Sequence, residues 1–210
     1  MMEEIKTFAM GFFAKAPGSH DWQHVLRVRN LCLHIAETEG ADRQVLEIAA
    51  YLHDIGRPAQ EASRGRICHG ERGAKIAGEF LERYPLDRET RNNILHCIRT
   101  HRFRGNHAPK TLEAKILFDA DKLDAIGAVG VARAFLFAGE VGATLHNPYL
   151  DPEEAEAYSE EDTGYREYKL KLAKIKERML TREGKRLAQE RHAFMEAFFE
   201  RFLEEVEGRV

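Results

Sequence analysis

The stretch that decides the fold is Ala49-Ala50-Tyr51-Leu52-His53-Asp54-Ile55-Gly56-Arg57-Pro58. It predicts the end of a buried helix, because Leu46, Ala49 and His53 share one helical face and a glycine and a proline follow. A buried imidazole or carboxylate is penalised by several kcal/mol unless a partner satisfies it. For an isolated pair, the ordinary interpretation is a core histidine bonded to a carbonyl beside a capping aspartate. The other polar residues of the chain therefore decide whether this pair only stabilises the core or belongs to a functional site.

Outside this stretch, apolar residues recur at helical spacing along most of the chain, and no segment alternates with a period of two. These patterns predict an all-α fold in the form of a compact helical bundle, with a single domain over residues 1–210. Its core is expected at about residues 20–142, and a pair of long helices at about 153–207 packs on it as a C-terminal hairpin. The expected helices cover residues 3–16, 22–39, 43–53, 69–84, 88–101, 112–126 and 131–138 and two charged segments that break near 181–184, while residues 58–66, 102–109 and 139–152 are expected to be loops.

The composition excludes several classes of protein. Of the 210 residues, 43% are hydrophobic and 32% are charged, which is typical of a globular chain. A net charge of -3 does not favour binding to nucleic-acid polymers or to anionic membranes. Cys32, Cys68 and Cys97 are odd in number and widely spaced, as expected for reduced thiols. Because the apolar run at residues 8–14 is too short for a signal peptide or a membrane span, we expect a cytoplasmic protein.

Several polar side chains lie on, or at the end of, otherwise apolar helices. They are His24, His53, Asp54 and an aspartate of the acidic cluster Asp119-Ala120-Asp121-Lys122-Leu123-Asp124. Ordinary core hydrogen bonds rarely satisfy so many inward-facing nitrogen and oxygen atoms, whereas one divalent cation such as Mn, Fe, Zn, Ni or Co would satisfy them together. Helical periodicity does not decide between Asp119 and Asp121, because they point to different faces of the helix.

These residues occur in the order and context of a known family. The segments HDWQHVLRV (20–28), LHDIGRP (52–58) and DADKLDAIGA (119–128) resemble the HD-domain metal-dependent phosphohydrolase superfamily. They look like a subfamily of small bacterial and archaeal HD hydrolases that includes nucleotide pyrophosphohydrolases. The segment at 165–199 extends the resemblance, which covers about residues 20–203. The resemblance implies a compact α-helical bundle, in agreement with the periodicity.

The resemblance also assigns metal ligands by position. His24, His53, Asp54 and Asp121 would bind one divalent metal ion, with Mn expected and Mg, Co, Ni, Fe or Zn as alternatives. The family's last ligand follows a small residue and directly precedes a basic one, which favours Asp121 over Asp119.

Two comparisons with the family pattern bear on the mechanism. Some HD nucleotidases place a glutamate three residues after the ligand aspartate to handle the attacking water. This chain has Arg57 there, which suits a phosphate oxygen better. Two-metal HD phosphodiesterases carry further histidines before the last aspartate, where this chain has His69, His96 and His101. The adjacent His-His pair typical of those enzymes is missing, so we expect one metal and keep two as the alternative.

The implied reaction is hydrolysis of a nucleotide or related phosphate compound. A divalent metal lowers the pKa of a bound water toward about 7, and that water would attack phosphorus. Lys122, with Arg57 or the loop cations Arg102 and Arg104, would neutralise the developing charge. His69 or His101 would relay a proton, and a helix-end histidine without a role is the alternative.

Further residues have weaker assignments. Asp124 could orient a ligand or Lys122. The resemblance alone suggests that Tyr165, Lys169 and Arg191 cover the substrate, and each could equally be a solvated helix residue.

Several functions remain open at this point. The first is cleavage of a nucleoside triphosphate to a monophosphate and pyrophosphate. The alternatives are a nucleoside monophosphatase, a cyclic-nucleotide phosphodiesterase, a non-catalytic HD module that senses a ligand, and a structural helical protein. The expected partner is a small-molecule nucleotide or phosphate substrate, with no nucleic-acid polymer and no membrane. A homodimer could form through the phenylalanines of the last helix, which are Phe194, Phe198, Phe199 and Phe202.

Overall fold

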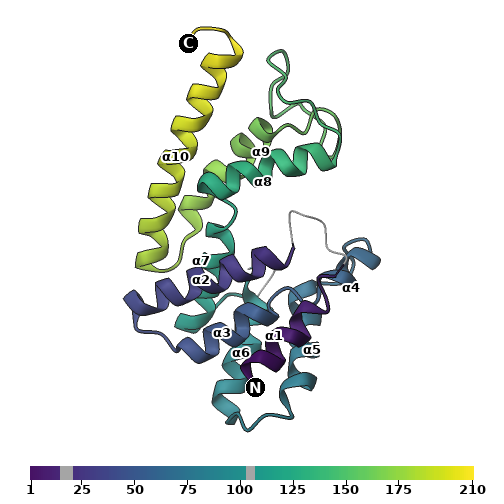
Figure 1. Ribbon diagram of the computed structural model, residues 1–210, viewed down its shortest axis with the longest axis vertical. Coiled ribbons are helices and arrows are strands. Elements are labelled where there is room, and N and C mark those ends of the chain that lie inside the picture. The colour runs from purple at the N-terminus through teal and green to yellow at the C-terminus, as the bar shows by residue number, and fades with distance from the viewer. Residues whose placement is uncertain (15–20, 103–106) are drawn as a thin grey trace. The chain divides into compact units, whose positions relative to one another are not determined.

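The computed structural model describes residues 1–14, 21–102 and 107–210. Every regular element within these ranges is a helix, which confirms the all-α prediction (Figure 1). The elements are α1 (Met2–Met10), α2 (Trp22–Glu39), α3 (Arg43–Leu52), α4 (Arg57–Ala62), α5 (His69–Leu81), α6 (Arg88–Thr100), α7 (Leu112–Leu123), α8 (Gly127–Glu140), α9 (Gly164–Leu170), the 3-10 helix η2 (Leu172–Arg178) and α10 (Arg182–Val206).

The helices form two compact units, Met1–Asp121 and Lys122–Val210. The first unit contains α1 to α6 and most of α7, and the second contains α8, α9, η2 and α10. The predicted single domain, with a C-terminal hairpin packed on its core, stays a prediction. None of the helices in the described ranges is long and apolar enough to cross a membrane.

Helix α3 lies at the centre of the first unit. Apart from Glu47, all residues from 45 to 52 are buried, and α3 packs against α1, α2 and α6. Burial on all faces is expected for a helix that other helices enclose. The two residues that follow it, His53 and Asp54, are therefore fully buried inside this unit.

Aspartate side chains cap three helices of the first unit. Asp21, Asp42 and Asp87 accept hydrogen bonds of 2.8–3.1 Å from backbone amides in the first turns of α2, α3 and α6. These bonds satisfy amide groups that a helix leaves without internal partners. Aspartate is one of the residue types preferred at this position, so these caps follow from the local sequence.

We expect removal of the α3 cap to destabilise the first unit. Asp42→Ala should lower the free energy of unfolding by about 1 kcal/mol, because the amides of Gln44 and Val45 lose their acceptor. Urea denaturation followed by circular dichroism measures the change. Asp42→Ser keeps a side-chain oxygen and should lose less. An unchanged midpoint in Asp42→Ala would contradict the assigned cap.

Gly56 brings the chain after α3 close to the backbone of α5. A Cβ atom at this position would lie 2.1 Å from the His69 carbonyl oxygen and 2.7 Å from the Gly73 nitrogen. The φ angle of Gly56 is -84°, which any residue can adopt, so the close approach is what requires glycine here. This contact places the His53-Asp54 turn beside the first turn of α5.

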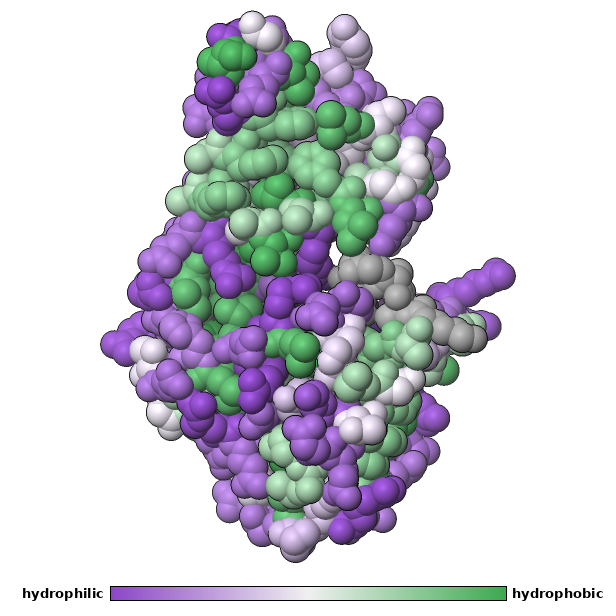
Figure 2. Space-filling view, viewed as in Figure 1, coloured by the Kyte–Doolittle hydropathy of each residue, from purple (hydrophilic) through white to green (hydrophobic). Residues whose placement is uncertain are grey.

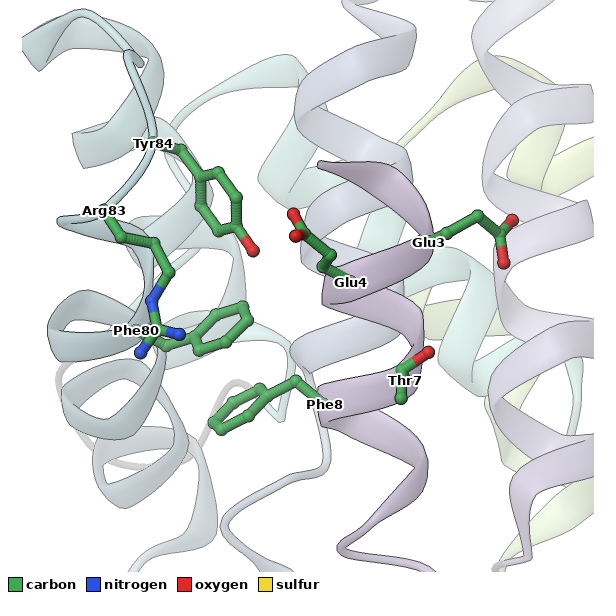
Figure 3. Close-up of a pocket in the computed structure, with 7 residues that line it drawn as sticks. All are labelled: Glu3, Glu4, Thr7, Phe8, Phe80, Arg83 and Tyr84. Atoms are coloured by element: carbon green, nitrogen blue, oxygen red, sulfur yellow. The ribbon is translucent and has the colours of Figure 1, made fainter.

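Helix α1 attaches to the first unit through aromatic side chains. Phe8 stacks on Phe80 near the end of α5 with ring centroids 3.7 Å apart, and the Arg83 guanidinium lies 4.5 Å from the Phe80 ring centre. An open pocket of about 610 Å³ lies around this stack, and Figure 3 shows the side chains that line it. Its lining residues are Glu3, Glu4, Thr7, Phe8, Phe80, Arg83 and Tyr84. Together with the buried side chains of Ile5 and Ala9, the stack holds this short helix in place.

Two segments of the first unit differ from the prediction. Helix α1 ends at Met10, and residues 11–14 are not helical, whereas the predicted helix covered residues 3–16. Residues 15–20 lie outside the described ranges. The predicted loop at 58–66 instead contains α4, with Pro58 in its first turn. A proline is tolerated there because the amide it lacks would have no partner inside the helix.

Two long helices were predicted for residues 153–207. The second is present as α10, but the prediction of the first was wrong. Its place is taken by a non-helical segment followed by α9 and η2. The buried Arg166 side chain donates to Asp162 at 2.7 Å and to the Ala155 carbonyl at 3.2 Å, which ties this segment to α9. The predicted break near 181–184 is confirmed, because Thr181 caps α10.

Aromatic side chains pack together in the second unit. Phe199 stacks on Tyr168 with ring centroids 4.3 Å apart, and its ring centroid is 6.2 Å from that of Phe135. Figure 2 shows a group of apolar residues on the visible face of this unit. Phe194, on the same helix as Phe199, is 47% exposed. The homodimer through these phenylalanines stays a prediction.

Candidate metal centre

Helix ends bring a set of polar side chains together inside the first unit. His24 lies in the first turn of α2, His53 and Asp54 follow α3, His69 begins α5, His101 follows α6, and Asp121 lies in the last turn of α7. The four histidines and Asp54 are at most 1% exposed, and the Asp121 side chain is 12% exposed. Such deeply buried polar groups are costly unless something satisfies them.

A first group of potential ligands consists of His24, His53 and Asp121. The Nε2 atoms of the two histidines are 3.3 Å apart, and Oδ1 of Asp121 lies 3.5 Å from Nε2 of His24. Asp54 Oδ2 is 3.5 Å from Nε2 of His53 and 3.7 Å from Nε2 of His24. The four residues that the resemblance assigned as ligands thus converge on one place.

A second group consists of Asp54, His69 and His101. The other carboxylate oxygen, Asp54 Oδ1, lies 3.2 Å from Nε2 of His69 and 3.4 Å from Nε2 of His101. These two Nε2 atoms are 3.0 Å apart. Asp54 therefore presents one oxygen to each group, so the two groups share it.

Hydrogen bonds on the far side of the rings fix which nitrogen carries the proton. Nδ1 of His53 is 2.7 Å from the Ala50 carbonyl oxygen, and Nδ1 of His101 is 2.7 Å from the Ile98 carbonyl oxygen. A carbonyl oxygen only accepts, so both Nδ1 atoms donate, and in the neutral form of each ring Nε2 carries the lone pair.

The centre therefore fits a cation. Lone pairs of imidazole nitrogens face the oxygens of a carboxylate, and Asp54 Oδ1 is buried without a hydrogen-bond partner among the described residues. Acceptors that face one another repel unless a proton or a metal lies between them. Imidazole and carboxylate together are typical ligands of Mn, Fe, Co, Ni and Zn. A divalent metal would thus satisfy what ordinary core hydrogen bonds leave unsatisfied.

Burial also sets the charge state of the centre. It lowers the pKa of His53 to about 4 and that of His69 to about 2, so both rings are neutral at pH 7. Burial alone would raise the pKa of Asp54, but His53 and Arg57 hold it well below its usual range. The result is a buried anion among neutral imidazoles, which is the charge state that metal binding requires.

Two arginines lie beside the centre, Arg57 at Asp54 Oδ2, which faces the first group, and Arg102 next to the partner of His69 in the second group. Arg57 forms an ion pair with Asp54 through its Nε atom, and Arg102 donates to Oε1 of Gln60 at 2.9 Å. Gln60 is a residue that sequence reasoning missed, because it falls in a segment predicted as a loop and no pattern marked it. Arg104, which the sequence also nominated, lies outside the described residues.

Other residues that were considered for the site from the sequence lie apart from these two groups. His96 accepts a hydrogen bond from the Lys110 amide at 2.9 Å, and Asp119 is fully buried on α7 without joining either group. Lys122 directly follows Asp121 in the chain and is half-buried.

The remaining residues that the sequence predicted for the site lie in the second unit. Asp124 forms an ion pair of 2.9 Å with Arg133, and Arg191 donates to the Leu123 carbonyl at 2.5 Å. The ring of Tyr165 lies 5.7 Å from that of Phe199, and Lys169 is an exposed residue of α9. Their roles toward a substrate stay predictions.

Residues 21–126, which include every residue of both groups, match the HD domain family. The chain belongs to the HD-domain family. This confirms the resemblance that the sequence motifs indicated.

Relatives of this HD protein span nearly its whole length. The Bacillus subtilis protein YpgQ is 33% identical to it over 98% of this chain and 94% of YpgQ. The crystal structure of an HD-superfamily hydrolase from Bacillus thuringiensis is 32% identical, covers 98% of this chain and 96% of that one, and has a TM-score of 0.77. The crystal structure of YpgQ in complex with ADP is 32% identical, covers 98% of this chain and 97% of that one, and has a TM-score of 0.73. This HD protein thus belongs to a hydrolase superfamily, and its His and Asp groups could hold a divalent metal.

Proposed function

We propose that this HD protein is a metal-dependent phosphohydrolase that acts on a nucleotide. The observation that carries the proposal is the buried Asp54 carboxylate, each of whose oxygens faces a pair of histidine Nε2 atoms. Arg57 donates to Oδ2, but Oδ1 has no hydrogen-bond partner among the described residues, whereas a core that served only for packing would place a donor at each oxygen. A centre that binds a cation places lone pairs there.

The ligand assignment follows the two groups. A first metal would be held by His24, His53, Asp54 and Asp121, with Mn as the expected ion. The same geometry supports a second cation on Asp54 Oδ1, His69 and His101. Two metals were the alternative to the single metal that the sequence predicted. When bound, a divalent metal supplies Lewis-acid chemistry, because it shields phosphate charge and lowers the pKa of water.

The protein's own cations would bind and orient the phosphate. Arg57 is held beside the centre by Asp54, and Arg102 is held by Gln60. A guanidinium can match two phosphate oxygens at once and stays charged at any physiological pH. Lys122, which follows Asp121, is the third cation that we assign to the developing charge. Arg57 also occupies the place where the family pattern of some HD nucleotidases has a glutamate, so a carboxylate base at that point is excluded.

The nucleotide substrate is supported by a relative. The crystal structure of YpgQ in complex with ADP shows that this similar protein binds a nucleoside diphosphate. We extend that ligand class to this HD protein and propose cleavage of a nucleoside triphosphate to a monophosphate and pyrophosphate. A nucleoside monophosphatase or a cyclic-nucleotide phosphodiesterase would use the same centre with a different bond.

The decisive experiment is hydrolysis of a nucleotide panel by metal-stripped protein, with Mn, Mg, Co, Ni, Fe or Zn added back singly. Pyrophosphate and phosphate are assayed separately. Metal-dependent release of pyrophosphate supports the proposal in full. Release of phosphate alone would indicate a phosphatase. Stoichiometric metal binding without any release would favour a ligand-sensing module.

Metal counting separates the two groups. We expect two Mn equivalents in the wild-type protein, and each of Asp121→Asn and His69→Gln should lose one of them, because each removes a ligand of a different group. Equilibrium dialysis with metal analysis measures the counts, and His34→Gln is the matched control for an exposed histidine.

The counts also decide the role of the second group. A metal there would occupy the Nε2 atoms that a proton relay through His69 or His101 needs. A wild-type count of one equivalent, unchanged in His69→Gln, would refute the second metal and favour the relay.

A further inference from the structure

The Gln60 side chain connects three segments beside the second ligand group. Its Oε1 atom lies 2.6 Å from Nδ1 of His69 and 2.9 Å from Nη1 of Arg102. Gln60 belongs to α4, His69 begins α5, and Arg102 comes just after α6. One amide oxygen thus contacts both a potential metal ligand and a cation that we assign to phosphate binding.

The Arg102 contact decides the protonation of the His69 ring. A guanidinium can only donate, so the Gln60 atom that faces it must be the oxygen and not the amide nitrogen. The same oxygen faces Nδ1 of His69, so that nitrogen must also donate. Nε2 of His69 is then left with its lone pair toward Asp54 Oδ1 and His101.

A competing tautomer exists, and Asp54 favours it. With the proton on Nε2, His69 would donate to Asp54 Oδ1 at 3.2 Å, which would satisfy that buried oxygen but remove the lone pair from the ligand group. Only the acceptor on the other side of the ring opposes this tautomer. Gln60 is the partner that the structure gives to Nδ1 of His69.

We infer that Gln60 is a positioning residue, which keeps the His69 proton on Nδ1 and holds Arg102 beside the second ligand group. The inference deepens the proposed function, since its purpose is to keep the centre able to bind a cation and a phosphate. Partners of this kind, one shell outside the ligands, orient metal-binding histidines in many proteins, and their loss typically reduces metal affinity about 10–100-fold.

The test reads the tautomer of His69 directly in the metal-free protein. Long-range proton–nitrogen NMR spectra of histidine-labelled protein distinguish an Nδ1-H ring from an Nε2-H ring, and loss of the signal in His69→Gln assigns it. We expect Nδ1-H in the wild type. Gln60→Leu, which has no acceptor, should shift His69 to Nε2-H. Gln60→Glu keeps an acceptor for both neighbours and should restore Nδ1-H.

Gln44 provides the matched control for the substitutions of Gln60. Gln44→Leu changes an exposed glutamine on α3 and should leave the His69 signal unchanged. An Nε2-H ring in the wild type, or an Nδ1-H ring in Gln60→Leu, would overturn the inference. The wild-type spectrum suffices for the first result, even where a variant fails to fold. Because no metal or nucleotide is present, a failed hydrolysis assay counts against the proposed function alone.

Discussion

Asp54→Asn is expected to abolish metal retention and to reduce nucleotide hydrolysis about 1,000-fold or more. The carboxylate supplies one oxygen to each ligand group, so its loss weakens both at once. Metal ions contribute several kcal/mol of transition-state stabilisation, and each tenfold in rate corresponds to about 1.4 kcal/mol. Steady-state hydrolysis with added Mn, together with metal analysis after gel filtration, measures both effects.

The same variant should remain largely helical. It leaves Arg57 without its carboxylate partner, but it also removes a carboxylate that faces imidazole lone pairs. Asp87→Asn is the matched control, because Asp87 is an exposed cap of α6 and asparagine caps a helix equally well. Full activity or full metal content in Asp54→Asn would refute the assigned centre.

Gly56→Ala is expected to destabilise the first unit by about 3 kcal/mol or more. Inserting one carbon into a packed interior typically costs about 1–3 kcal/mol, and here the new atom would meet backbone rather than a side chain that can move. The shift needed to relieve the contact would also move His69 away from Asp54. Urea denaturation followed by circular dichroism gives the stability, and Mn titration gives the effect on the second ligand group.

Gly139→Ala provides the matched control for this substitution. Gly139 lies in α8, and a Cβ atom there meets nothing within 4 Å. Its stability should be unchanged or slightly increased, since alanine is the better helix residue. Equal stability of Gly56→Ala and the wild type would contradict the close contact between Gly56 and the backbone of α5.

Local signals predicted the helix ends, whereas the potential ligands were assigned by the family resemblance, because periodicity left Asp119 and Asp121 undecided. Caps such as Asp42, and the glycine and proline after His53, mark helix ends from a few neighbouring residues. The ligands lie at those ends, so the motifs and the fold pointed to the same residues. The division of Asp54 between two groups was not predictable, because it depends on how α5 and α6 pack around one carboxylate.

The errors in the second unit have a physical origin as well. Asp162 and Arg166 are four residues apart, a spacing that usually indicates an ion pair along a helix. In the structure this pair is buried, and Arg166 also binds the Ala155 carbonyl, which stabilises a turn instead. Gln60 was missed for a similar reason, since its two partners are 9 and 42 residues away along the chain.

The ion pair between Arg57 and Asp54 separates the assembly of the protein from its supply of metal. Because the chain itself provides a counter-ion for its buried carboxylate, the first unit can fold before any ion arrives, unlike small zinc domains whose folding depends on the metal. Without a metal, Arg57 pairs with Asp54 Oδ2, while Oδ1 has no hydrogen-bond partner among the described residues. Under the proposed function, the ion that the folded protein carries would be set by the metal concentrations around it, so exchange of the metal would need no new synthesis.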